Sequence, residues 1–381
     1  TKDRKSSFIY LNHYIKKSDW DEEHAKVRKS YTNSKRMNNL LEKKRSDAEK
    51  IKIDFDLKDI PYSAEMIKDE MINNRRTNSF FDYAEGYFDR ILKEGNYYRH
   101  SAEKSAVNHL EKFVDGKQLT FSQITLTLLE DFRAYLIGEL RLSKRTVFNH
   151  LVVIRSIFNK AIKQRIVDQS FYPFGKDGME LKRPVSQKIG LELKEIKQLE
   201  SAVFQEDDFR FHALNYFLFS FYHAGMRASD LLLLKWSDIK AGRIHYVMRK
   251  NAKPGSIKIP DKARPILSYY EEFTEPGQEY IFPEMNAYPK DLDNVELQKA
   301  LKYRKKKIDS YLRKIGEALR LSIPLTLHVA RHSFASISGD KIPIQRLQEL
   351  FRHSNITTTI GYMKQFLNKG SDEALDHVLN Y

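Results

Sequence analysis

Cysteine is absent from the 381-residue chain. Its absence excludes disulfide bonds, cysteine-ligated zinc and thiol nucleophiles, and fits a reducing compartment. Long apolar runs are also missing. None approaches the roughly 20 residues that a membrane helix needs, and no signal-peptide pattern opens the chain. Because the first residue is Thr1, we expect that the N-terminus is trimmed.

Positive charge, by contrast, is in surplus. The chain has 66 Lys and Arg against 51 Asp and Glu, a net charge of +15. This surplus favours a polyanionic partner, although charge says nothing about fold. Hydrophobic residues make up 41% and aromatic residues 12%, enough to build cores and to exclude wholesale disorder. The length is too great for one ordinary core, so we expect two or three domains.

Residues 1–60 are expected to form a small N-terminal domain. Segments 8–11 and 14–15 are interpreted as one or two strands, and apolar residues at helical spacing run from Ser34 to about Ile53. This part of the chain has more basic than acidic side chains. A DNA-binding surface and an ordinary solvated surface explain that excess about equally well. A break at Pro61 ends the domain, and a polar helical connector should follow.

Residues 78–168 show helical periodicity throughout and should form a four-helix domain. Gly95 and Gly116 should end the first two helices, and Ser143 should cap the fourth. The polar face of that fourth helix holds four candidate DNA contacts, Lys144, Arg145, Asn149 and Arg155. A solvated face is the plain alternative, and with this net charge we weigh the two equally.

Residues 169–190 have the glycine and proline content of a linker. Residues 191–381 form the largest block and should be mostly helical. One β-hairpin is expected there, with strands near 244–248 and 256–259 around a lysine-containing turn. The expected fold class is therefore mainly α with small β elements.

Two histidines stand one helical turn apart, at His328 and His332, which is the spacing of a zinc-binding helix. Zinc hydrolases carry a general-base Glu directly after the first histidine, and Val329 occupies that position here. No further ligand set at a sensible spacing accompanies them, so we expect no metal. Local hydrogen bonding is the plain explanation of the pair.

Two other segments, around Arg227 and around Tyr362, also carry residues that could act at a site with this pair. Arg227 follows Gly225 at a tight junction between two expected helices, where a guanidinium can point into a cleft. Tyr362 stands nine residues after His353, and Ser354 should cap the helix that leads to it. Taken singly, the arginine could be a capping or surface residue, and the tyrosine is one of 21.

Together these segments resemble the tyrosine recombinase (phage integrase) family. The matching segments follow the family order over about 140 residues: Gly225–Leu231, Arg249–Pro254, His328–His332, Leu350–Ser354 and Tyr362. Each motif alone is weak, whereas their joint order and spacing are specific. The domains ahead of them are similar to the arm-type and core-binding domains of integrases of bacterial mobile elements, especially Bacteroides-type conjugative transposons.

The resemblance implies a helical core-binding domain, a mostly helical catalytic domain with a hairpin, and a site-specific recombinase that integrates or excises a mobile element. It assigns catalysis to six residues, Arg227, Lys250, His328, Arg331, His353 and Tyr362. The arginines would hold the phosphoryl oxygens, and Tyr362 would form a 3′-phosphotyrosyl link. Lys250 would protonate the leaving 5′ oxygen, with Lys253 as its competitor.

The same resemblance implies double-stranded DNA as partner and neither metal nor cofactor. Four active sites are needed to exchange two duplexes, so a homo-tetramer on DNA is expected, with the C-terminal tail exchanged between protomers. Accessory DNA-bending factors are possible partners. The expected location is the bacterial cytoplasm, at the nucleoid when DNA is bound, with no membrane association.

Two residues depart from the family pattern. Ala330 stands where the family usually has Leu, and Arg352 where it usually has Gly. The first could loosen local packing, and the second adds a charge beside the site.

Two other functions stay open. A type IB topoisomerase shares the cleavage chemistry, and an accessory protein could bind DNA without cutting it. The separate N-terminal domain argues against the first, and the complete catalytic set against the second.

Overall fold

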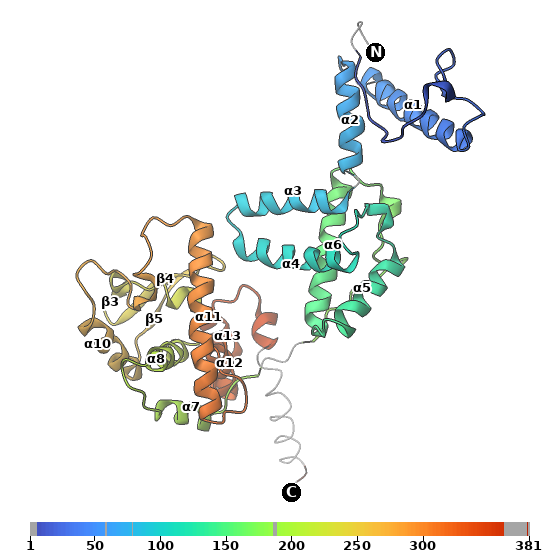
Figure 1. Ribbon diagram of the computed structural model, residues 1–381. Helices are drawn as coiled ribbons and strands as arrows, with labels where there is room; N and C mark the ends of the chain where they lie inside the picture. Colours follow the sequence, from blue (N-terminus) through green and yellow to red (C-terminus); the bar gives the residue numbers. More distant parts are fainter. Residues whose placement is uncertain (1–5, 58, 78, 186–188, 362–378, 380–381) are drawn as a thin grey trace. The chain divides into compact units, whose positions relative to one another are not determined.

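The computed structural model describes the whole chain except residues 1–5, 58, 78, 186–188, 362–378 and 380–381 (Figure 1). The chain divides into two compact units, residues 1–94 with 99–184 and residues 95–98 with 185–381. Helices dominate both, with one two-stranded and one three-stranded antiparallel sheet. The expected fold class, mainly α with small β elements, is confirmed.

The N-terminal region contains a small sheet and two helices. Its elements are β1 (Trp20–Asp21), β2 (Lys26–Val27), α1 (Ser34–Leu57) and α2 (Ala64–Thr77). The expected helix from Ser34 and the helical connector after Pro61 are both present. Segments 8–11 and 14–15, however, form no strand. Phe8, Tyr10 and Tyr14 are largely exposed, and no described segment pairs with this stretch, so its β propensity has no partner strand to act on.

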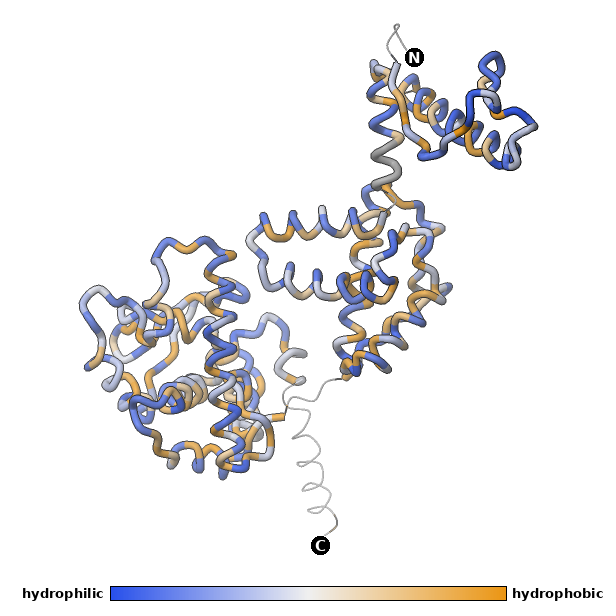
Figure 2. Tube along the Cα trace, in the orientation of Figure 1, coloured by the Kyte–Doolittle hydropathy of each residue, from blue (hydrophilic) through white to orange (hydrophobic). Residues whose placement is uncertain are grey.

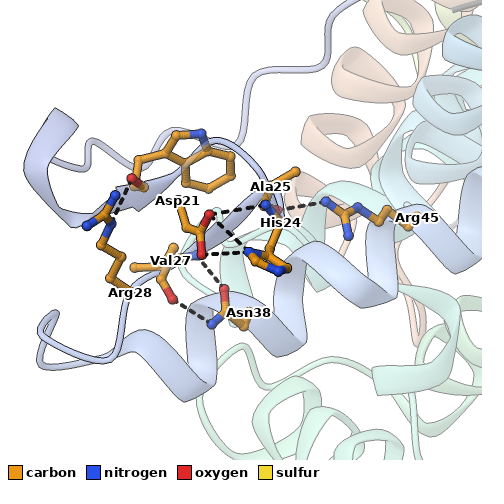
Figure 3. A network of polar contacts seen from close by, with 8 residues as sticks. Asp21, His24, Ala25, Val27, Arg28, Asn38 and Arg45 are labelled. Atoms are coloured by element: carbon orange, nitrogen blue, oxygen red, sulfur yellow. Dashed lines mark hydrogen bonds and ion pairs between the residues drawn. The ribbon is translucent and has the colours of Figure 1, made fainter.

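Strand β2 is attached to α1 by one side-chain amide (Figure 3). Asn38 Oδ1 accepts from the Val27 N–H at 2.7 Å, and Asn38 Nδ2 donates to the Val27 carbonyl at 2.9 Å. Two turns further along α1, Arg45 donates to the Ala25 carbonyl at 2.7 Å. A two-stranded sheet is marginal by itself, so these bonds hold it against the helix.

Four amphipathic helices follow, α3 (Phe80–Lys93), α4 (Tyr97–Phe113), α5 (Leu126–Gly138) and α6 (Lys144–Lys163). Figure 2 shows apolar and polar residues alternating around them. Phe80, Phe121 and Phe158 meet edge-on in their core, a favoured aromatic geometry. Ser143 caps α6 as expected, because its hydroxyl accepts from the Thr146 N–H.

The stretch expected to be a linker, 169–190, is only partly one. Phe174 and Met179 are buried in the core of the four-helix unit, and Phe174 lies against Phe158. A short turn brings them there, since the Met179 N–H donates to the Pro173 carbonyl. The glycines and prolines that suggested a linker therefore lie partly in this buried turn.

The described part of the C-terminal unit contains seven labelled helices, a sheet and a further helical stretch at residues 356–361. Its helices are α7 (Leu193–Glu200), α8 (Phe209–Tyr222), α9 (Ala228–Leu231), α10 (Arg264–Glu272), α11 (Asn294–Ala318), α12 (Leu327–Ser338) and α13 (Ile344–Phe351). Its strands are β3 (Ile239–Lys240), β4 (Arg243–Val247) and β5 (Pro254–Lys258). Single-turn 3₁₀ helices join elements in both units: Lys17–Asp19, Phe121–Gln123, Gln169–Phe171, Trp236–Asp238, Asp261–Ala263, Pro283–Met285 and Gly339–Lys341.

Helix α8 is the centre of this unit and packs against both α11 and α12. It is apolar on every side, as expected of a buried helix, and Tyr216, Phe217 and Phe219 are fully buried in it. Strands β4 and β5 form the expected hairpin, in which Tyr246 pairs with Gly255. The packing of α8 on α12 brings the Arg227 junction next to the helix that carries His328 and Arg331.

Candidate active site

The chain reverses direction sharply after α8, and Arg227 follows this reversal. Ala224 and Gly225 both adopt left-handed backbone, with φ of 54° and 64°, and the Ser220 hydroxyl donates to the Met226 carbonyl at 2.7 Å. Arg227 is then the N-cap of α9. Its half-buried side chain makes one hydrogen bond within the described residues, a weak one of 3.6 Å from Nη1 to Met248 Sδ. The guanidinium therefore keeps most of its donors for a ligand.

Gly225 is needed for a second reason, its close approach to α12. A Cβ atom at Gly225 would lie 2.3 Å from the Cα atom of Arg331, so only glycine allows the two segments to touch. Ala330, the residue before Arg331 on α12, is fully buried in the core. The expectation that this alanine could loosen local packing stays a prediction.

Arg331 is 4% exposed and donates to two main-chain carbonyls. Its Nη1 bonds the Gly225 carbonyl at 3.1 Å and its Nη2 the Phe351 carbonyl at 2.9 Å. The guanidinium also stacks on the Phe351 ring, with Cζ 4.0 Å from the centroid. Arg331 thus connects the end of α8, helix α12 and the end of α13.

His353 completes this connection. Its Nε2 lies 3.1 Å from Arg331 Nη2, and its Nδ1 lies 3.0 Å from the hydroxyl of Thr359, which is fully buried. Because a guanidinium can only donate, Nε2 accepts, and Nδ1–H donates to Thr359. The sequence interpretation did not include Thr359, which carries no motif of its own.

A cavity brings three of the predicted catalytic residues together. Arg227, His328 and Arg331 line it, and Lys305 of α11 joins them. Lys305 pairs with Asp309, whose other oxygen accepts from the Leu327 N–H at 2.9 Å at the start of α12. Asp309 therefore caps the helix that carries the two predicted residues, while Lys305 adds a cation that sequence motifs did not reveal.

The predicted lysines lie on the turn between β4 and β5. Lys250 is exposed and Lys253 is half-buried. One end of the turn is attached to α9, the helix that Arg227 caps, because the Arg249 N–H donates to Asp230 Oδ1 at 3.0 Å. Burial raises the pKa of Asp230, while this hydrogen bond and the charge of Arg227 counteract it.

Tyr362, the predicted nucleophile, lies outside the described residues, as does the C-terminal tail apart from Leu379. Residues 356–361 are helical and lead towards it. The cap of this turn is Asn355 rather than the expected Ser354, because Asn355 Oδ1 accepts from the Thr357 N–H at 2.8 Å. Asparagine is as good a cap as serine, so sequence alone could not separate the two neighbours.

The candidate DNA contacts on α6 differ in exposure. Lys144 and Asn149 are exposed, whereas Arg145 and Arg155 are half-buried. Arg145 donates to the Pro184 carbonyl at 3.3 Å and lies over the Phe148 ring. The face that these residues share is opposite the buried side of the helix.

Metal-ligand clusters and membrane-spanning helices are both absent from the described residues. No group of three or more His, Asp or Glu side chains there is arranged to hold a metal ion. His328 and His332 instead pack edge to face, with ring centroids 4.5 Å apart. Within the same ranges, every helix is too short or too polar to cross a membrane.

Comparison with known families covers nearly the whole sequence. Residues 190–368 match the phage integrase family, residues 79–179 the phage integrase SAM-like domain, and residues 1–68 an Arm DNA-binding domain. The chain belongs to the phage integrase family of tyrosine recombinases, as its motifs indicated.

Individual relatives agree with this assignment. Tyrosine recombinase XerA of Thermococcus onnurineus is 33% identical over 159 residues, 40% of this chain and 52% of XerA. Tyrosine recombinase XerC of Pediococcus pentosaceus is 25% identical over 283 residues, 69% of this chain and 88% of XerC. The chain thus spans about half the length of the XerA relative.

Solved structures show the same fold. A lambda integrase tetramer bound to a Holliday junction superposes with a TM-score of 0.56 at 16% identity, over 92% of this chain and 97% of lambda integrase. The Tn1549 transposon integrase in complex with transposon right end DNA gives 0.54 at 18% identity, over 78% and 98%. At these identities the two likenesses show a shared fold.

Proposed function

We propose that this protein is a site-specific DNA recombinase that integrates or excises a mobile element through a 3′-phosphotyrosyl intermediate. The observation that carries the proposal is the convergence of Arg227, His328 and Arg331 on one cavity, with His353 bonded to Arg331. These residues come from segments over 100 positions apart in the chain, and all carry donors suited to a phosphate.

The chemistry follows from the charge that develops during attack on a phosphodiester. The phenolic oxygen of Tyr362 forms a bond to phosphorus, and the bond from phosphorus to the 5′ oxygen breaks. Arg227 supplies fixed donors to the phosphoryl oxygens as they gain charge, and Arg331 fixes the cavity wall beside them. His328 lies at the same cavity, where it can accept the proton that the phenol loses and return it in religation. His353 would bond the scissile phosphate.

The leaving 5′ oxygen must take up a proton. A lysine on the β4–β5 turn suits this general-acid step, and Lys250 is our assignment because it is exposed at the turn. Religation follows the same bond changes in reverse. The DNA 5′ hydroxyl attacks phosphorus, the phosphotyrosyl bond breaks, and the proton returns to the lysine. The energy of the cleaved bond is conserved throughout.

Binding to DNA is proposed to use the four-helix domain and the catalytic domain together. Lys144, Arg145, Asn149 and Arg155 are the proposed contacts of α6 with the phosphate backbone. Exchange of two duplexes needs four copies of the site, so we infer a homo-tetramer on DNA, to which accessory DNA-bending factors could be added. Such a reaction belongs to the bacterial cytoplasm, where the DNA of a mobile element lies.

The C-terminal tail is proposed to dock on a neighbouring protomer and so to couple assembly to the position of Tyr362. The tail sequence supports this, since Leu375, Val378 and Leu379 recur at the spacing of one helix face after the glycine at 370. Truncation after Lys369 should leave single-site binding intact and reduce tetramer assembly. Equal assembly by truncated and full chains would contradict tail exchange.

Covalent trapping tests the main proposal. A random duplex library is first selected with the full chain, and the selected site is then nicked so that cleavage releases a short strand and cannot reverse. The wild type should give a protein–DNA band that survives denaturing electrophoresis. Tyr362→Phe should bind this DNA equally well without forming the band, whereas the matched variant Tyr381→Phe should form it.

The alternatives give other results. A type IB topoisomerase would relax an unrelated supercoiled plasmid at low enzyme concentration, which this recombinase should not do. A non-catalytic accessory protein would bind the selected duplex and yield no covalent band with any nicked substrate. A band that persists in Tyr362→Phe would show that a different tyrosine is the nucleophile.

A further inference from the structure

Arg352 adopts a backbone conformation that residues with a side chain usually avoid. It is the C-cap of α13, with φ of 50° and ψ of 40°. The left-handed region crowds Cβ against the following carbonyl oxygen, which is why glycine is the usual residue there. A side chain retained at such a position should make contacts that compensate for the strain.

Those contacts are with the β4–β5 hairpin. The guanidinium lies over the ring of Tyr246, with Cζ 4.1 Å from the centroid. Its Nη1 donates to the Tyr246 carbonyl at 3.1 Å and more weakly to the Lys253 carbonyl at 3.5 Å. Arg352 therefore combines a cation–π contact with two main-chain hydrogen bonds across the hairpin.

The hairpin has room for this guanidinium because of one glycine. Gly255 is the cross-strand partner of Tyr246. A Cβ atom there would lie 2.9 Å from both Cζ and Nε of Arg352. The side chain thus occupies a space between the aromatic ring of one strand and the bare backbone of the other.

The same residue also holds the tip of the hairpin through its main chain. Asn251 Nδ2 donates to the Arg352 carbonyl at 3.2 Å. On the other side of Lys250, the Arg249 N–H donates to Asp230. The two neighbours of Lys250 are consequently fixed to different parts of the catalytic domain, one near Arg227 and the other beside His353.

We propose that Arg352 is a positioning residue that fixes the hairpin, and with it the Lys250 main chain, relative to His353 and the segment leading to Tyr362. The inference rests on the proposed function of Lys250 as general acid. Arg352 does not touch the reacting atoms in this role. It acts by restricting where the lysine can reach, so its loss should affect proton donation to the 5′ oxygen and little else.

The test uses the full chain and two nicked duplexes, one with the normal 5′ oxygen and one with sulfur at that bridging position. A sulfur leaving group needs no proton. Arg352→Gly removes the side chain and also the backbone strain, so the protein should stay folded. It should cleave the oxygen substrate at least about 10-fold more slowly, part of the roughly 100-fold or more that a general acid contributes, and cleave the sulfur substrate at the wild-type rate.

A second variant and a matched control complete the design. Gly255→Ala narrows the space for the guanidinium and should show the same selective loss. Arg320→Gly removes another exposed arginine in left-handed backbone, at φ of 53° beyond the end of α11. It relieves strain far from the hairpin, and both substrates should be cleaved at wild-type rates.

Each outcome decides one of two questions. No covalent band from the wild type would overturn the proposed function. A wild type that cleaves both substrates, together with rescue of Lys250→Ala by sulfur, leaves that function intact. Against this background, an equal loss on both substrates in Arg352→Gly, or no loss on either, would overturn the positioning role.

Discussion

Arg331 donates a hydrogen bond to the imidazole of His353, from Nη2 to Nε2 at 3.1 Å. The bond determines the tautomer, since Nε2 must carry the lone pair and Nδ1 the proton that Thr359 accepts. In this state the Nε2 atom cannot donate to a phosphate. The role proposed for His353, donation to the scissile phosphate, therefore requires that its contact with Arg331 be broken.

Arg227 and Arg331 should differ in their effect on stability, although both serve the same cavity. Arg331→Ala leaves two buried carbonyls, of Gly225 and Phe351, without a donor, at a cost of about 1–3 kcal/mol each. Arg227→Ala loses a weak sulfur contact and the attraction between its charge and Asp230, but it leaves no buried carbonyl without a donor, so its melting temperature should fall less. Thermal unfolding of the three proteins checks this, and equal melting temperatures would contradict the structural role of Arg331.

Cleavage, in contrast, should fall in both variants. Arg227→Ala should be at least about 100-fold slower per folded molecule, the scale for losing one preorganised donor. Single-turnover rates on the nicked duplex, at saturating protein and below the melting temperature, provide the comparison. An Arg227→Ala protein with a near wild-type rate would show that this arginine lies outside the reaction.

Lys250 and Lys253 can be separated by the same leaving-group substitution. Sulfur at the bridging position should restore cleavage to Lys250→Ala but not to Arg227→Ala, because only the lysine supplies the proton. Lys253 contributes its main-chain carbonyl to the Arg352 contact, and Lys253→Ala should retain cleavage of both substrates. Selective rescue of Lys253→Ala would exchange the two assignments.

The structure brings Arg227, His328 and Arg331 to one cavity, and the sequence could point to their segments because each depends on local features. Gly225 before Arg227, and the spacing within 328–332, encode a turn and a helix directly. The contacts of Asp309 and Arg352 could not be foreseen, since each joins separate elements of the chain. The bond between His353 and Thr359 is local, but no composition signal marks it. The strand expected at 8–11 failed for a similar reason, because pairing depends on a partner that propensity does not specify.

Asp309 should stabilise α12 through its acceptor rather than through its charge. Asp309→Ala removes the cap of the Leu327 N–H and should cost about 1 kcal/mol or more, with slower cleavage because His328 follows directly. Asp309→Asn keeps an oxygen at the same place and should lose much less. Melting temperatures and single-turnover rates distinguish the two variants, and equal losses would indicate that the pair with Lys305 is what matters.

The four-helix domain should lose stability in acid because of a buried histidine pair. His109 Nδ1 and His150 Nε2 lie 2.8 Å apart with stacked rings. Burial lowers the pKa of His150, and the charge of His109 lowers it further; burial and Lys112 lower the pKa of His109. The unfolded state therefore binds protons more readily, and stability present above pH of about 6.5 declines as the pH falls.

Substitution of His150 tests whether the histidine pair makes stability decline as the pH falls. In His150→Gln the decline in melting temperature between pH 7 and pH 5 should be smaller than in the wild type. Some decline should remain, because burial also lowers the pKa of His223, to about 4, in the other unit. The exposed His13 gives the control, since His13→Gln should follow the wild-type curve. An unchanged pH dependence in His150→Gln would show that the pair does not limit stability.

The N-terminal domain is expected to bind a second DNA site, apart from the crossover site, because its excess of basic residues is separated from the rest by the break at Pro61. Deletion of residues 1–60 should leave cleavage of a short core duplex intact and weaken binding to longer DNA from the element end. Asn38→Ala provides a finer test, since it removes both hydrogen bonds that hold β2 on α1. The exposed neighbour gives the control, Asn39→Ala, which should bind the longer DNA normally. If the deletion weakened binding to both DNAs equally, the domain would support the core interaction instead of recognising its own site.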